Sequence, residues 1–153
     1  MPNKYKWHIV VVPEDGATRQ LGNGLSNAFP SIVNRVKFLR EAGGWPDAIA
    51  TIKDLKLDKY PNRRVLLIID LDQDDTRLGF IRSQPEISKY NNRIFILGSF
   101  KAVEQLKPVG RSSNLESVGQ RLGEDCSCWN DSLLIACRED ACRLKAEIEN
   151  ISD

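Results

Sequence analysis

Acidic residues follow the apolar segments of this chain at the points where strands of a sheet are expected to end. Glu14 follows the first such segment, whereas Asp70, Asp72 and Asp74 follow the third. Carboxylates crowded together repel one another, and a bound cation stabilises such a cluster. Hard oxygen ligands suit Mg²⁺ or Mn²⁺, which often also contact phosphate groups of a substrate. The pattern predicts a divalent metal site at Asp70, Asp72 and Asp74, with Glu14 as a catalytic residue that transfers a proton.

Three other polar residues also follow predicted strands and are candidates for an accessory role at the same site. They are Asp15, Glu41 and Ser99. No phosphate-binding glycine motif, neither Gly-x-Gly-x-x-Gly nor Gly-Lys followed by Ser or Thr, comes after the first predicted strand. The sequence therefore predicts no cofactor-binding residues beyond the metal ligands.

The elements that would position these residues alternate between strands and helices. Apolar runs rich in β-branched residues, or an alternating pattern in the second case, predict strands at 7–12, 33–39, 65–69 and 94–97. Apolar residues at helical spacing predict helices at 17–28 and 46–57. Strands that alternate with helices are typical of a parallel sheet covered on both faces. We expect a three-layer α/β domain with a mainly parallel, four-stranded sheet of the Toprim or Rossmann kind.

The whole chain is expected to form one domain, 1–153. Its 153 residues and 41% hydrophobic content fit one ordinary core. The parallel α/β core is predicted at 7–99, and a helical C-terminal region that caps the sheet is predicted at 100–153. Within that region, helical spacing indicates one helix around 115–122 and a longer final helix around 133–148.

The carboxyl ends of parallel strands meet at one edge of a sheet, where ligands of open α/β sheets bind. If the first and third strands are neighbours, Glu14 lies within several ångströms of Asp70 and Asp72. Among basic residues, Arg19, Arg77 and Lys101 are best placed to contact a phosphate at this edge. Trp45 is expected to pack the second strand against its helix, with stacking on a nucleobase as the alternative.

The acidic segments resemble the Toprim domain, the fold shared by primases, topoisomerases, small ribonucleases and nucleases of the overcoming-lysogenization-defect type. In that family a glutamate follows the first strand and an Asp-x-Asp follows the third. The matching residues are Glu14, in the sequence VVVPEDG, and Asp70 and Asp72, in LLIIDLDQD. The resemblance covers residues 7–99. Typical members have glycine before the glutamate, where this chain has Pro13.

The resemblance implies a function as well as a fold. Glu14 would be an acid/base residue or a metal ligand, and Asp70 and Asp72 would hold a divalent metal. The activity implied is metal-dependent phosphoryl transfer or nuclease-type chemistry on nucleic acid. A non-catalytic Toprim-like interaction subunit is the alternative, and whether the chain is an enzyme stays open at this point.

Two other folds place acidic residues after strands. A receiver domain that accepts a phosphoryl group would use Asp70, Ser99 and Lys107, but only eight positions separate Ser99 from Lys107. A crossover needs about a dozen residues or more, so this spacing argues against a receiver. The nucleophile motif of haloacid dehalogenases also fits Asp70-Leu-Asp72, but it normally lies near the N-terminus and needs later strands.

The remaining chemistry-bearing residues favour structural roles. His8 is the single histidine and falls inside a predicted strand, so we expect it to be packed. The four cysteines are Cys126, Cys128, Cys137 and Cys142. Their spacing lacks the paired Cys-x-x-Cys of most zinc sites, which favours packing over a zinc site.

Charge and hydropathy limit the choice of partners. The net charge is +1, which gives no global attraction to nucleic acid or to anionic membranes. No apolar run is long enough for a signal peptide or a membrane span, so we expect a cytoplasmic protein with no membrane partner. Nucleic acid, a protein partner and a homodimer all remain open.

Overall fold

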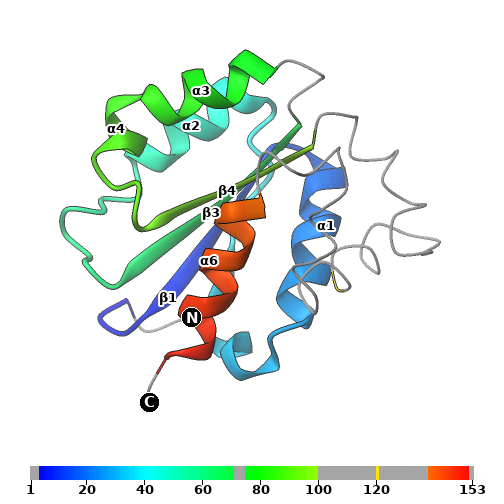
Figure 1. The fold of residues 1–153 in the computed structure, drawn as a ribbon, viewed down its shortest axis with the longest axis vertical. Helices are drawn as coiled ribbons and strands as arrows, with labels where there is room; N and C mark the ends of the chain where they lie inside the picture. Colours follow the sequence, from blue (N-terminus) through cyan, green and yellow to red (C-terminus); the bar gives the residue numbers. More distant parts are fainter. Residues whose placement is uncertain (1–3, 71–74, 100–119, 121–137, 152–153) are drawn as a thin grey trace.

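A four-stranded sheet forms the centre of the fold (Figure 1). The computed structural model describes residues 4–70, 75–99, 120 and 138–151. The strands are β1 (His8–Pro13), β2 (Val36–Phe38), β3 (Arg63–Asp70) and β4 (Ile94–Ser99). They lie in the order β2-β1-β3-β4, and every neighbouring pair is parallel. The predicted α/β class with a parallel four-stranded sheet is confirmed, and β1 and β3 are neighbours.

Helices cover both faces of the sheet, as the three-layer prediction required (Figure 1). The helices are α1 (Gly16–Asn27), α2 (Trp45–Lys53), α3 (Asp75–Ser83), α4 (Pro85–Ser88) and α6 (Arg138–Glu149). α1 and α6 share one face, while α2, α3 and α4 lie on the other (Figure 1). Because both faces are covered, all of β1 and residues 65–69 of β3 are buried, and their apolar runs are continuous.

One glycine explains how closely α1 approaches the sheet. Gly22 lies in the middle of α1, where a glycine costs about 1 kcal/mol of helix stability relative to alanine. A Cβ at this position would lie 2.8 Å from Cδ1 of Ile68 and 3.5 Å from Cγ1 of Val11. Gly22 therefore allows the helix axis to lie nearer to β1 and β3 than a larger residue would allow.

The second strand is shorter than the alternating pattern predicted. A 3₁₀ helix, η1 (Pro30–Arg35), occupies the first part of the expected strand, and β2 has only three residues. Pro30 fixes a turn conformation at the start of η1, and Ile32 is buried within it. Tertiary packing of Ile32 thus overrides the alternation that suggested a strand from residue 33.

One predicted helix is shorter than expected, and the final predicted helix is described only in part. α2 ends at Lys53, not near Leu57, because the chain turns there and Lys56 adopts a positive φ of 53°. The final helix is described from Arg138 onwards. The helix expected around 115–122 and the start of the final one lie outside the described residues. Within the described part, no helix has the length and apolar character needed to cross a bilayer.

Side chains of α6 take the place of a fifth strand along the outer edge of β4. The Asp140 carboxylate accepts a hydrogen bond from the Ile96 N–H at 2.8 Å, and Arg143 Nη2 donates to the Ile94 carbonyl at 3.1 Å. Asp140 is 4% exposed and also pairs with Arg82 at 3.4 Å. Two backbone groups at this edge of the sheet are thereby satisfied, which limits pairing with another chain.

We predict that Gly22→Val lowers the free energy of unfolding by about 1–3 kcal/mol, because the added atoms collide with buried side chains. Gly79→Ala in α3 is the matched control, since no atom of the described residues lies within 4 Å of a Cβ at that position. It should leave stability unchanged or raise it by about 0.5–1 kcal/mol through helix propensity. Urea denaturation measures both variants, and equal stability of Gly22→Val and the parent chain would contradict the close packing.

Candidate functional site

Glu14 and Asp70 meet where β1 and β3 end. Pro13 of β1 is in register with Ile68 of β3, and the Glu14 N–H donates to the Ile68 carbonyl at 3.1 Å. The Glu14 side chain also reaches the end of β3. Its Oε2 atom accepts a hydrogen bond from the Asp70 N–H at 2.7 Å. The structure therefore brings these two predicted residues together, as parallel neighbouring strands require.

Backbone hydrogen bonds from the loop after β2 also hold the peptide groups on either side of the Glu14 Cα. The Ala42 N–H donates to the Pro13 carbonyl at 3.0 Å, and the Gly43 N–H donates to the Glu14 carbonyl at 2.9 Å. Gly43 has a φ of +89°, a conformation that side-chain-bearing residues rarely adopt. Glu14 is thus fixed between the segments that follow β2 and β3.

Burial raises the pKa of the Glu14 carboxyl above its usual range. The nearby negative charges of Asp15 and Asp70 raise it further. The hydrogen bond from the Asp70 N–H and the positive charge of Arg77 act in the opposite direction, but they do not cancel the rise. A half-buried carboxyl with a raised pKa holds a proton more strongly than an exposed carboxyl, a property that general acid–base catalysis uses.

Asp15 has a structural role in this arrangement. Its carboxylate Oδ1 accepts a hydrogen bond from the Thr18 N–H at 2.9 Å, and the Thr18 hydroxyl in turn accepts from the Asp15 N–H. This reciprocal pair caps the N-terminus of α1. One oxygen of the predicted accessory carboxylate is therefore committed to the helix, although its charge still acts on Glu14.

Of the other predicted residues, Glu41 lies near a basic side chain, and the rest are wholly or partly outside the described residues. Glu41 is exposed, and its carboxylate lies 4.0 Å from Arg19. Ser99 is in register with Asp70 at the end of β4, but its side chain is outside the described residues, as are Asp72 and Asp74. Among the residues that the structure describes, no three His, Cys, Asp or Glu side chains are grouped closely enough to hold a metal. Asp70 is the one predicted metal ligand that the structure describes, and further ligands would have to come from Asp72 and Asp74.

Arg77 lies at the edge as predicted, whereas its aromatic neighbours were only partly foreseen. Arg77 Nη1 donates to the Asp70 carbonyl at 3.1 Å, and its guanidinium lies 5.3 Å from the centre of the Trp45 ring. Trp45 makes an edge-to-face contact with Phe80 of α3 at 5.7 Å. No sequence pattern pointed to Phe80, because its partner in this contact, Trp45, belongs to another helix. Arg19 instead donates to the Leu39 carbonyl, and Lys101 lies outside the described residues.

The single histidine is buried, and the last cysteine is partly buried. His8 is 2% exposed, and its Nε2 accepts a hydrogen bond from Arg63 Nε at 3.0 Å. His8 lies in β1 at the start of the sheet, away from Glu14, which supports packing. Cys142 is half-buried in α6, and the other three cysteines are outside the described residues.

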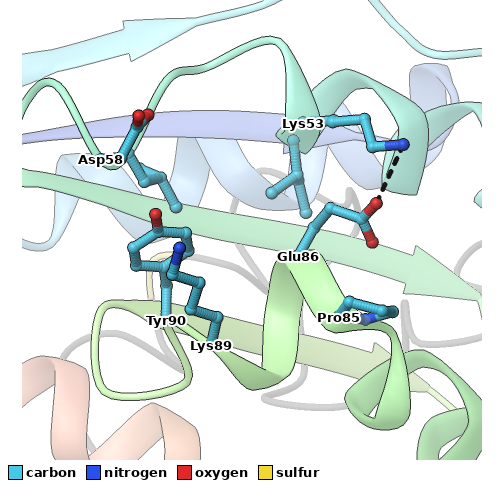
Figure 2. A pocket seen from close by; sticks show the side chains of 8 residues that line it. Lys53, Asp58, Pro85, Glu86, Lys89 and Tyr90 are labelled. Atoms are coloured by element: carbon cyan, nitrogen blue, oxygen red, sulfur yellow. Dashed lines mark ion pairs between the residues drawn. The ribbon is translucent and has the colours of Figure 1, made fainter.

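A separate cavity of about 260 Å³ lies between α2 and α4 (Figure 2). Its lining mixes apolar residues with Lys53, Asp58, Glu86 and Lys89. Lys53 and Glu86 form an ion pair of 3.1 Å across one end, as Figure 2 shows. Neither Glu14 nor Asp70 lines this cavity, so it does not extend the acidic site.

Comparisons with known proteins do not assign the site to a family. No protein-family model, curated protein or solved structure matches the chain. The function of this edge must be inferred from the geometry of Glu14, Asp70 and Arg77.

Because nearby charges affect the pKa of Glu14, two substitutions should change this pKa in opposite directions. Asp15→Asn keeps an oxygen that can cap α1 but removes a negative charge, so the pKa of Glu14 should fall. Arg77→Gln removes a positive charge, so the pKa of Glu14 should rise. Side-chain carboxyl NMR titration measures both shifts, with Asp58→Asn at a distant loop as the control that should change nothing. A Glu14 pKa that is the same in all three variants would contradict this electrostatic account.

Proposed function

We propose that this chain is a Toprim-like protein that binds Mg²⁺ or Mn²⁺ and hydrolyses phosphodiester bonds in nucleic acid. The observation that supports this proposal most directly is the hydrogen bond from the Asp70 N–H to the Glu14 carboxylate. It brings the acidic residues that follow two different strands to one edge, in the order that the Toprim pattern requires. The ends of parallel strands are also the general ligand-binding position of open α/β sheets.

Glu14 is proposed as the residue that moves the proton. Its carboxylate would accept a proton from the attacking water while the water oxygen forms a bond to phosphorus. The phosphorus–oxygen bond to the leaving nucleotide then breaks, and that oxygen takes a proton from solvent. A raised pKa, caused mainly by burial, makes Glu14 a stronger base than an exposed carboxylate.

Asp70, Asp72 and Asp74 are the residues that would hold the metal. A bound divalent ion would neutralise charge on the phosphate and lower the pKa of water. Carboxylate oxygens are the ligands that Mg²⁺ and Mn²⁺ prefer, so the donor type at Asp70 fits this role. Arg77, which is anchored to the Asp70 carbonyl, would add positive charge next to the phosphate.

Metal binding can be tested apart from catalysis. We expect Mn²⁺ and Mg²⁺ to bind the parent chain in isothermal titration calorimetry, and binding to be lost in the double variant Asp70→Asn/Asp72→Asn. Asp58→Asn serves as the matched control, because Asp58 is an acidic residue on the separate α2–α4 cavity and its loss should not affect the affinity. If the parent chain binds neither ion, the proposed metal site is refuted.

Hydrolysis is the second test. Single- and double-stranded DNA and RNA should be cleaved in the presence of Mn²⁺, and Glu14→Gln should reduce kcat by about 100-fold to 10,000-fold, the usual contribution of general acid–base catalysis. Cleavage that is undiminished in Glu14→Gln would refute the proton role. Metal binding without any cleavage would instead support the non-catalytic interaction subunit.

A further inference from the structure

Phe80 exposes an aromatic ring beside the candidate site. It is 53% exposed, and only Tyr5 and Val33 are more exposed among the large hydrophobic side chains of the described residues. Phe80 and Trp45 make an edge-to-face contact at an interplanar angle of 84°, so the Trp45 ring fixes the position of the exposed Phe80 ring between α2 and α3. Both helices lie on this face of the sheet (Figure 1).

The residue before Phe80 supports a ligand-binding interpretation of this surface. Gly79 lies inside α3, where glycine costs about 1 kcal/mol relative to alanine. Gly22 offsets a similar cost by close packing, but a Cβ at Gly79 would meet no described atom within 4 Å. Packing against the described residues therefore does not explain Gly79, whereas the close approach of a flat external group to the helix would.

Arg77 connects the aromatic surface to the acidic edge. Its guanidinium lies over the Trp45 ring, and its Nη1 atom donates to the carbonyl of Asp70. Asp70 in turn donates its N–H to the Glu14 carboxylate. Two aromatic rings, a cationic group and the proposed metal-binding edge are thus linked through consecutive contacts.

We infer that Phe80 and Trp45, with the open helix surface at Gly79, form a stacking platform for a base of single-stranded nucleic acid. A base would stack on the exposed Phe80 ring, and Arg77 would contact the phosphate that follows it. Bases within a duplex are already stacked on their neighbours, so an exposed ring favours unpaired strands. The placement of that phosphate at Glu14 and Asp70 rests on the proposed function, whereas the binding of the strand does not.

The aromatic platform defined by Trp45, Gly79 and Phe80 can be tested by fluorescence anisotropy with a labelled oligothymidine, in Mg²⁺ and in EDTA. We expect Phe80→Ala to raise Kd about 10-fold to 100-fold, since a base stacked on an aromatic side chain contributes strongly to affinity. Phe80→Tyr should restore most of the affinity. Val33→Ala is the matched control, because Val33 is 63% exposed on η1 at the opposite end of the sheet, and its Kd should not change.

Gly79→Leu separates binding from folding. Leucine is a better helix former than glycine, its Cβ would meet no described atom within 4 Å, and both Gly79 and Phe80 are exposed, so we expect the melting temperature to stay equal or rise. The leucine side chain would nevertheless cover the helix surface next to Phe80, and we expect it to weaken oligothymidine binding at least 10-fold. A purely structural role of this segment could not produce higher stability together with weaker binding.

The outcomes distinguish this inference from the proposed hydrolysis. Strand binding that depends on Phe80, without cleavage, supports the platform and counts against the nuclease. Cleavage by the parent chain with an unchanged Kd in Phe80→Ala overturns the platform and leaves the nuclease standing. No affinity for oligothymidine also overturns the platform, as does a dimer that Phe80→Ala dissociates in size-exclusion chromatography, because the ring would then bind a second copy of the chain.

Discussion

Parallel pairing of β1 with β3 is the constraint on which the candidate site depends. It places Pro13 opposite Ile68, and the chain after each strand must then leave the sheet at the same edge. The hydrogen bond from the Asp70 N–H to the Glu14 carboxylate is the direct consequence of that register. A shift in this register would separate Glu14 from the Asp70 N–H, so the position of Glu14 at the edge is fixed by the pairing of the two strands.

Charged side chains have different roles at the two ends of the sheet. At the start of the strands, arginines meet acceptors within the chain: Arg63 donates to His8, Arg64 pairs with Glu147 of α6, and Arg93 donates to the carbonyls of Tyr60 and Leu57. These contacts hold α6 and the loops against the sheet. At the other end, Glu14 is kept partly buried among other carboxylates, which raises its pKa. Such an arrangement does little for stability and is typical of sites that bind ligands or move protons.

The parts of the fold that could be predicted are those with strong local signals. The long apolar runs of β1, β3 and β4 identified the central strands, and the acidic residues after them identified the edge where Glu14 and Asp70 meet. β2 was placed imprecisely, because three residues carry little pattern and the burial of Ile32 depends on tertiary packing. Phe80 was not predicted, and Asp15 was predicted as an accessory site residue and not as a helix cap, for a similar reason. Phe80 matters through its contact with a different helix, and Asp15 through hydrogen bonds that a count of acidic residues does not reveal.

The central claim is that Glu14 and Asp70 belong to one divalent-cation site, and paramagnetic NMR with Mn²⁺ tests it most directly. A bound Mn²⁺ ion broadens the amide signals of residues near it. Our account predicts selective loss of the Glu14, Gly43 and Asp70 amide signals at low Mn²⁺ concentration, while His8 and Asn62 at the start of the strands keep theirs. Broadening centred elsewhere, or no selective broadening at all, would contradict a shared metal site at this edge.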